Sequence, residues 1–205
     1  ASTYLFLSHT LHKETREKQI DKYRQLWINL IIDRNDPTFG IQSLRNMIMT
    51  NTYLISLATI LMGGIISVLF ARQDPGAAIA LVESSDISTY ISYLTKHPAA
   101  IKIFTAMGII LLSIYNFTIS LRILNNLNFT APAVIKLPEA REFQMEQIRR
   151  QSRHFFTGIR ALYSFFGPVI WIFDTTGMII FTVITTVAFL RFDFLPNRKL
   201  GPMKD

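Results

Sequence analysis

The sequence contains no cysteine among its 205 residues, and it lacks the short motifs that mark common classes of enzyme. Without a thiol it has no disulfide framework, no thiolate metal site and no cysteine nucleophile. A glycine-rich phosphate loop is missing, and so is a Gly-x-Ser-x-Gly element. Nothing in the sequence argues for an enzyme, and we predict no catalytic residue and no bound cofactor.

Histidine is also scarce, with four residues at His9, His12, His97 and His154. His9 and His12 are three residues apart and near Glu14, but a third ligand at a suitable spacing is missing. No pair of histidines lies inside an apolar run, as a haem with two histidine ligands would require. We therefore expect neither a metal site nor a haem.

Charged residues make up only 17% of the chain, against about 25% in an average soluble domain. Hydrophobic residues make up 50%, and they gather in long runs instead of short amphipathic periods. The formal net charge is +7, but the basic residues flank the long apolar runs, as they do in membrane proteins. This distribution argues against nucleic acid as a partner and indicates a lipid bilayer.

Three apolar runs are long enough to cross a bilayer, which needs about 20 mostly apolar residues. They cover residues 47–71, 101–124 and 161–190, and the last is longer than one crossing requires. Strands are excluded because open strands leave backbone groups unpaired in lipid and because the alternation of a barrel strand is missing. We predict one all-helical membrane domain over residues 1–205, with three complete spans.

Loop charge predicts which ends of the spans face the cytoplasm, because Lys and Arg accumulate on that side. Segments 11–45 and 125–160 are rich in Lys and Arg, whereas the loop between the first two spans carries few. We expect the two basic segments to be cytoplasmic and the chain to be a multi-pass protein of an inner or plasma membrane. The C-terminal tail would then lie outside, although it carries four basic residues.

Residues 11–32 are predicted to form an amphipathic helix before the first span. Five apolar residues share one of its faces: Ile20, Tyr23, Trp27, Leu30 and Ile31. Two positions are open for this helix. It lies either in the headgroup layer with Trp27 as anchor, or packed on the protein's own cytoplasmic face.

Residues 139–160 are predicted to form a second cytoplasmic helix, which continues into the third span. Steps of three and four residues separate the members of a heptad seam: Met145, Ile148, Ser152, Phe155, Ile159, Leu162 and Phe166. The expected partner of this seam is the helix of residues 11–32, with a partner subunit as the alternative. Pro168 is expected to kink the helix or to start a second one.

Asp174 is the acidic residue inside the third predicted span. At mid-membrane an acid costs about 2.5–3.5 kcal/mol on insertion scales, so it needs a polar partner, water or a proton. Asn116 is the expected partner from its depth in the second span. Two interpretations stay open: a proton or cation site, and an interhelical hydrogen bond that fixes packing.

The first span carries two further polar features. Arg45 and Asn46 stand at its cytoplasmic mouth, where an arginine side chain reaches for lipid phosphates. Thr59, Gly63 and Ser67 recur every four residues, so their small side chains predict a packing face for another helix. That helix belongs either to the same chain or to another subunit.

Two stretches of the chain resemble the domain-of-unknown-function family 599. They are Gln42-Ser-Leu-Arg45-Asn46-Met-Ile-Met49, and Arg160-Ala-Leu-Tyr163 followed by Trp171. The resemblance covers residues from about 27 to 194, and it implies four spans with the first near the N-terminus. Residues 1–9 would then be the cytoplasmic end of that first span. Because the family has no established activity, the resemblance implies a fold and not a function.

Two functions fit these observations. The first is a non-catalytic accessory or structural subunit of a larger membrane complex, which would bind other membrane subunits or a second copy of itself. The second is a small proton- or ion-coupled transporter that uses Asp174 as its ionisable group. A water-accessible cavity at Asp174 would favour the transporter, whereas a dry contact between Asp174 and Asn116 would favour the subunit.

Overall fold

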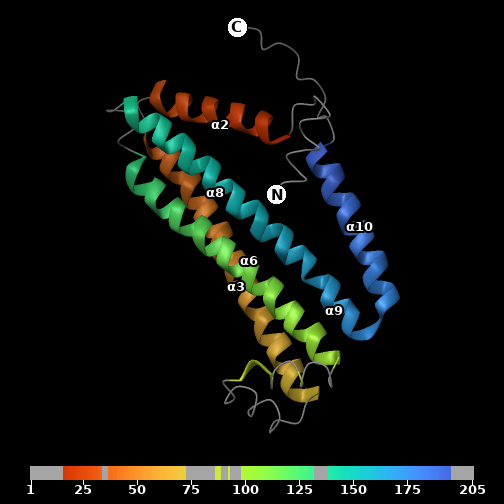
Figure 1. The fold of residues 1–205 in the computed structure, drawn as a ribbon. Coiled ribbons are helices and arrows are strands. Elements are labelled where there is room, and N and C mark those ends of the chain that lie inside the picture. The colour runs from red at the N-terminus through yellow and green to blue at the C-terminus, as the bar shows by residue number, and fades with distance from the viewer. Residues whose placement is uncertain are drawn as a thin grey trace.

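The computed structural model describes residues 16–33, 37–72, 86–88, 92, 98–131 and 138–194 (Figure 1). Its helices are α2 (Arg16–Asp33), α3 (Pro37–Arg72), α6 (Pro98–Thr130), α8 (Pro138–Ser164), α9 (Phe166–Phe173) and α10 (Thr175–Phe194). No strand occurs in these ranges, and the predicted all-helical fold is confirmed. The expected end of a first span at residues 1–9, together with His9 and His12, lies outside the described residues.

Three stretches are long and apolar enough to cross a membrane: Thr38–Val68, Pro98–Thr130 and Ala140–Phe173. The α6 helix has 33 residues and is therefore about 50 Å long, more than the ~30 Å thickness of a hydrocarbon core. The predicted runs 47–71 and 101–124 lie inside α3 and α6. The third crossing differs from the predicted run 161–190, because it begins earlier and ends earlier.

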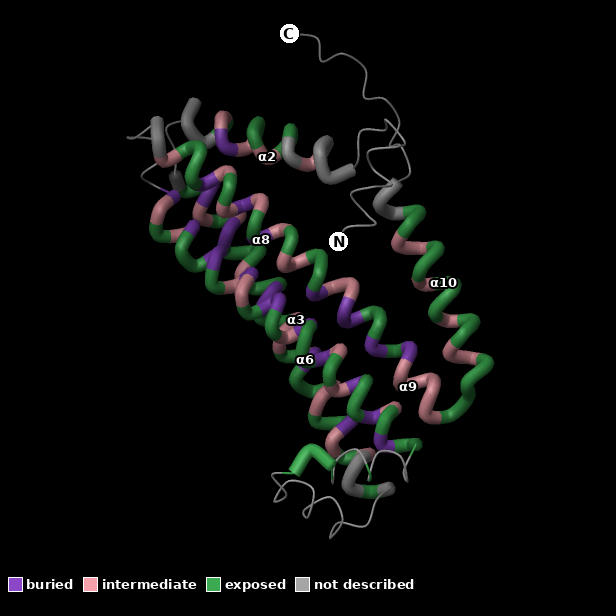
Figure 2. The backbone as a smooth tube through the Cα atoms, viewed as in Figure 1, coloured by how far each residue is buried: buried purple, intermediate pink, exposed green. Residues whose placement is uncertain are grey.

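The α6 helix is the centre of the bundle, with α3 on one side and α8 on another (Figure 1). The α3, α6 and α8 helices alternate in direction, and α9 continues the course of α8 (Figure 1). Buried residues follow α6 along almost its whole length (Figure 2). Its fully buried apolar side chains are Ala100, Ile103, Ala106, Ile110 and Phe117. The core of the protein is thus a seam on each side of α6.

The third predicted run is not one helix, because the chain reverses at Asp174. The backbone of Asp174 is extended (φ −147, ψ 129), and its N–H donates to the Ile170 carbonyl at 2.9 Å. Its carboxylate accepts the N–H groups of Thr176 at 3.1 Å and Gly177 at 2.6 Å. This is the geometry of an N-cap, for which Asp is a preferred residue. One side chain therefore starts α10 in a new direction inside an apolar run.

The α10 helix returns along the bundle and ends at the same end as α2 (Figure 1). The expectation for the run 161–190 placed its end at the other end of the bundle, and the side of the membrane on which the C-terminal tail lies stays a prediction. The expectation assumed one uninterrupted helix over residues 161–190. With the reversal, Arg191 at the end of α10 lies at the end of the bundle where the described basic segments gather, which agrees with the loop-charge rule for this residue.

A second interruption separates α8 from α9 at Phe165. Pro168 has no N–H to donate to the carbonyl four residues earlier, so the helix weakens there. The chain keeps its course through this point, with the Val169 N–H bonded to the Phe165 carbonyl at 3.4 Å. The predicted effect of Pro168, a kink or the start of a second helix, is confirmed.

The α2 helix lies across one end of the bundle and packs on it through Ile28 (Figure 1). Ile28 is 1% exposed and belongs to a cluster with Leu44, Leu124 and Ile148. Tyr23 and Leu30 of the predicted apolar face are instead exposed. The predicted contact face of this helix was therefore wrong by part of a turn, because Ile28 stands apart from the main apolar stripe.

Residues 86–88 lie in the loop between α3 and α6. The Asp86 carboxylate accepts the Ser88 N–H at 3.1 Å and the hydroxyl of the same residue. These hydrogen bonds hold the pKa of Asp86 below its usual value. Asp86 thus caps the helical turn of residues 87–88.

Candidate functional site

A ladder of polar side chains joins α6 to α8 along their whole contact. The Ser113 hydroxyl donates to the Gly158 carbonyl at 2.8 Å, and the Gln151 amide donates to the Ser120 hydroxyl at 3.0 Å. Nearer the α2 end, the Gln144 amide donates to the Thr130 hydroxyl at 3.3 Å. Residue numbers rise on α8 as they fall on α6, as expected of two antiparallel helices.

Asn116 and His154 form the fourth rung of this ladder. The His154 Nδ1 lies 3.1 Å from the Asn116 Oδ1, and the Asn116 amide nitrogen donates to the Leu112 carbonyl at 2.8 Å. Because an amide oxygen only accepts hydrogen bonds, the proton of this contact belongs to the Nδ1 of His154. The rung therefore requires a hydrogen on the Nδ1 of His154.

The structure does not bring Asp174 and Asn116 together. Asp174 bonds to the first turn of α10, whereas Asn116 bonds to His154. The predicted contact between Asp174 and Asn116 was wrong because the prediction assumed that Asp174 lies in the middle of a straight helix. His154 is half-buried and is the hydrogen-bond partner of Asn116 that the sequence analysis expected Asp174 to be.

The heptad seam of α8 is displaced from the predicted one. The side that packs on α6 follows Gln144, Ile148, Gln151, Phe155, Gly158, Leu162 and Phe165. Ile148, Phe155 and Leu162 belong to both seams. The predicted members Met145, Ser152 and Ile159 are half-buried, and Phe166 is exposed. Apolar spacing missed the true seam because two of its positions are glutamines.

The partner of this seam is α6, and α2 touches only its beginning. Ile28 of α2 packs with Ile148, and the Arg141 guanidinium donates to the Asn29 side chain. Farther along α8, Phe155 and Leu162 pack in the cluster that contains Phe117 of α6. The expectation that α2 is the main partner was therefore wrong, because α2 crosses the bundle instead of running along α8.

Gly158 permits the closest approach between α6 and α8. A Cβ at this position would lie 2.8 Å from the Phe117 ring, nearer than real Cβ atoms come to other atoms. The Phe117 ring also packs at 6.0 Å from that of Phe155. Together these residues close the hydrophobic core around the ladder.

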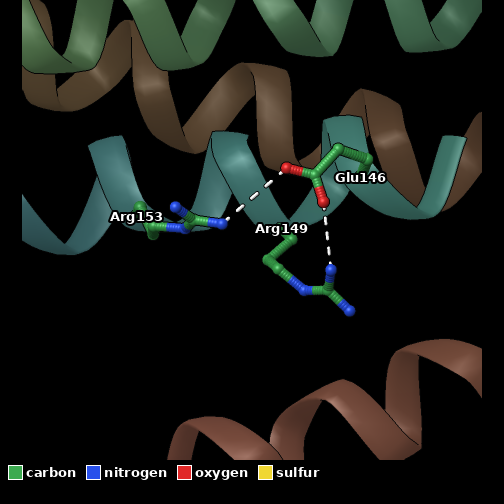
Figure 3. A network of polar contacts seen from close by, with 3 residues as sticks. All are labelled: Glu146, Arg149 and Arg153. Carbon is green, nitrogen blue, oxygen red and sulfur yellow. Dashed lines mark hydrogen bonds and ion pairs between the residues drawn. The ribbon is translucent and has the colours of Figure 1, made fainter. Parts of the chain in front are cut away.

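Arginines and an acid occupy the side of α8 that points away from α6. The Glu146 carboxylate lies 3.0 Å from Arg149 and 3.8 Å from Arg153 (Figure 3). These side chains lie on the side of α8 that faces α2, with α3 and α6 behind (Figure 3). The Arg153 side chain is 59% exposed, and Arg160, half-buried, follows two turns farther on. A polar stripe thus continues along the outside of the third crossing.

Lys102 of α6 bonds to the C-terminal end of α9. The chain reversal leaves the last carbonyls of α9 without the helical N–H groups that would bond them. The Lys102 ammonium of α6 donates to the Trp171 carbonyl at 2.7 Å and lies 5.2 Å from the centre of the Trp171 ring. A cation is favourable at a helix C-terminus, so Lys102 fixes the end of α9 against α6.

The small residues predicted as a packing face on α3 point away from the bundle. Thr59, Gly63 and Ser67 are exposed, and the two hydroxyls bond to carbonyls of their own helix. A Cβ added at Gly63 would meet nothing within 4 Å. The intramolecular alternative for this face is therefore excluded for the described residues, and contact with another chain stays a prediction. Arg45 and Asn46 are exposed as well.

The part of α3 that faces α6 carries one buried polar residue, Asn51. Asn51 is 1% exposed and donates to the Met47 carbonyl at 3.0 Å, while its Oδ1 has no hydrogen-bond partner. Within the described ranges, no three His, Asp or Glu residues gather in a way that could hold a metal ion.

Comparisons with known proteins agree with the resemblance found in two stretches of the sequence. Neither the curated proteins nor the solved structures include a match to this chain. The model of one protein family, described as a protein of unknown function, DUF599, matches residues 2–197. Since the match covers nearly the whole chain, the protein belongs to the DUF599 family.

Proposed function

We propose that the protein is a non-catalytic membrane subunit that binds other membrane-embedded chains through the outer side of α8 and through α10. The observation that carries this proposal is the arginine stripe on α8, because it lies within the crossing Ala140–Phe173. Arg153 is 59% exposed beside Glu146, and lipid tails are a poor environment for an exposed ion pair, whereas a neighbouring chain supplies polar groups that bond to it.

The ladder shows how deep the stripe lies. Between Lys102 and Arg122, α6 has 19 residues without charge, about 28 Å of helix. Ser113 stands near the middle of this run, and it bonds to the carbonyl of Gly158. Arg153 is nearer the α2 end but still within the depth of the uncharged run.

The exposure of α10 also indicates that the contact surface lies on this side of the bundle. From Thr175 to Arg191, where its side chains are described, no residue is buried. Ile180, Val183 and Ile184 are each more than half exposed, although they lie beside an arginine-bearing helix. A helix from a partner chain between α10 and the stripe would cover both.

The transporter is the weaker candidate. It depended on an acid at mid-membrane, and the Asp174 carboxylate instead caps the first turn of α10 at the end of the crossing. Its two hydrogen bonds to backbone N–H groups explain its presence without a transported ion.

The test is the mass of the assembly extracted in native lipid nanodiscs and measured by native mass spectrometry. We expect a species heavier than the 23.5 kDa chain, in a fixed ratio of components. Arg153→Leu should weaken this assembly, because leucine cannot pair with a carboxylate, although it suits lipid better than arginine does. Arg122→Leu, at an exposed arginine on α6, is the matched control. A lone chain in wild-type nanodiscs would contradict the proposal.

A further inference from the structure

The part of α8 beyond Glu146 carries positive charge without a matching acid. Residues 147–164 contain no Asp or Glu, and they contain four arginines: Arg149, Arg150, Arg153 and Arg160. The Glu146 carboxylate accepts a hydrogen bond from Arg149 at 3.0 Å, whereas its distance to Arg153 is 3.8 Å, beyond hydrogen-bond range (Figure 3). The Arg153 guanidinium therefore keeps N–H donors for a second acceptor.

The rungs at Gln151 and His154 give the level of Arg153 in the bundle. They bond to the two ends of the segment 116–120 on α6. Arg153 is therefore level with this segment, which lies about 3–9 Å of helix inside Arg122. Because Arg122 ends the uncharged run of α6, the backbone of Arg153 is level with side chains that meet lipid tails.

A carboxylate on a neighbouring helix suits this place better than a phosphate of the headgroup layer. A phosphate would approach from the α2 end of the bundle, where the exposed Glu146 carboxylate stands, and the two negative groups would repel each other. A carboxylate on a helix beside α8 approaches from the side. Its two oxygens also match the forked N–H donors of Arg153.

A second copy of this chain does not supply such a carboxylate. The helices that pack along α8 and continue it contain no Asp or Glu in residues 37–72, 98–130 and 166–173. Copies in one membrane share one orientation, so a two-fold axis would set α8 parallel to its copy, with Arg153 opposite Arg153. Glu146 of the copy would then be seven residues away, about 10 Å along the helix. A different chain is needed to balance the charge.

On the basis of the partner-binding role proposed above for α8, we propose that its partner is a different membrane protein, with an Asp or Glu in an apolar helix at the depth of Arg153. The carboxylate of this helix bonds to the Arg153 guanidinium. The apolar side chains of the same helix pack on the exposed Ile180, Val183 and Ile184 of α10.

The composition of the assembly is the first test. The full chain is extracted in native lipid nanodiscs, and native mass spectrometry should find a second protein of different mass beside the 23.5 kDa chain. Masses that are whole multiples of one chain would overturn this partner but leave a subunit that binds its own copies. A single chain, bare or carrying only anionic phospholipid, would instead contradict the proposed function itself.

A lipid-soluble carbodiimide tests the contact directly, because it joins an amine to a neighbouring carboxylate. The amide forms as one carboxylate oxygen passes to the carbodiimide, which leaves as a urea. Arg153→Lys supplies the amine, and Glu146→Gln in the same chain removes the acid beside it. Arg122→Lys with the same Glu146→Gln change is the matched control, at an exposed arginine of α6.

We expect peptide mass spectrometry to find an amide between position 153 and an Asp or Glu of the second protein, and none from position 122. An amide to another copy of this chain would overturn the proposal. So would an assembly that keeps its mass without forming an amide at position 153. Loss of the second protein from the Arg153→Lys variant would overturn it as well, because lysine retains the positive charge.

Charge reversal checks the same ion pair without a cross-linker. Arg153→Glu should lower the fraction of the chain in the heavier species several-fold, whereas Arg122→Glu should leave it unchanged. Substitution of the cross-linked acid in the second protein by Lys should restore the assembly with Arg153→Glu. Equal losses with the two Glu variants, or no restoration, would contradict a direct contact between the two charges.

Discussion

Phe117 and Gly158 illustrate how single residues set the distance between α6 and α8. The phenyl ring occupies the space that any side chain larger than hydrogen would need. The Gly158 carbonyl is also an acceptor for Ser113, so the close approach and the hydrogen bond occur at one place. Both contacts depend on a glycine that has no special backbone angle and is chosen for its size.

Gly158→Ala should destabilise the protein by about 1–3 kcal/mol, because the added methyl group forces the Phe117 ring to move. The free energy of unfolding, from SDS titration in mixed micelles, is the measurement. Phe117→Leu should recover part of the loss in the double variant. Gly108→Ala, on α6 in open space, should be neutral or stabilising by about 0.5–1 kcal/mol. Equal losses at both glycines would refute this explanation.

Asp174→Ala should lower the free energy of unfolding by about 1 kcal/mol, because α10 loses the side chain that accepts its first N–H groups. Asp174→Asn keeps an oxygen acceptor and should retain most of the stability. The melting temperature in detergent distinguishes the two variants. If Asn were as harmful as Ala, the charge and not the cap would be the important property.

At the scale of elements, the ladder explains why α6 and α8 stay in one register. Apolar side chains at helical spacing tolerate sliding by a turn, whereas each rung matches one donor with one acceptor. The buried rungs sit between apolar clusters at both ends of the contact. An unmatched rung would leave a polar group without a partner inside the bundle, which makes a shifted register unfavourable.

Gln151→Leu should cost about 0.6–2 kcal/mol, the range of hydrogen bonds between membrane helices. The double variant Gln151→Leu/Ser120→Ala should lose less stability than the sum of the two single variants. The reason is that Gln151→Leu alone already removes the partner of the Ser120 hydroxyl. Thr118→Ala combined with Gln151→Leu is the control, because Thr118 is exposed and bonds to its own helix. Additive losses in the Ser120 pair would show that this rung does not couple the helices.

For the whole molecule, the reversal at Asp174 decides the topology. The three crossings α3, α6 and α8–α9 alternate in direction, and α10 adds a shorter apolar helix that runs back. The ends of α2 and α10 therefore share one end of the bundle, and the start of α6 lies at the other (Figure 1). This arrangement gathers the basic segments on a single side.

Single cysteines should reveal this topology in sealed vesicles, because the chain has none of its own. Gln25→Cys and Arg191→Cys should react with a membrane-impermeant maleimide from the same side. Ala99→Cys, at the start of α6, should react from the other side. Labelling of positions 99 and 191 together would mean that α10 does not return, and that the third run crosses as one helix.

Much of the fold was predictable from the sequence, but less of the site. The lengths of the uncharged runs predicted α3 and α6, and the proline at position 168 marked a break near Phe165. The ladder was missed because Gln144 and Gln151 count as surface residues in any apolar pattern. Lys102 was missed because the acceptor it serves, the Trp171 carbonyl, exists only where the chain reverses.

The sequence alone determines whether each segment prefers lipid or water. The hydrophobicity of a segment is the sum over its own residues and does not depend on which residues pack against it. Lipid as the environment and helices as the elements follow from that sum, whereas the return of α10 does not. Only the tertiary structure decided which face of α8 is inside, which partner Asn116 takes and what Asp174 does. Each of these depends on a hydrogen bond between groups that meet in space, and a donor's place in the sequence does not reveal its acceptor.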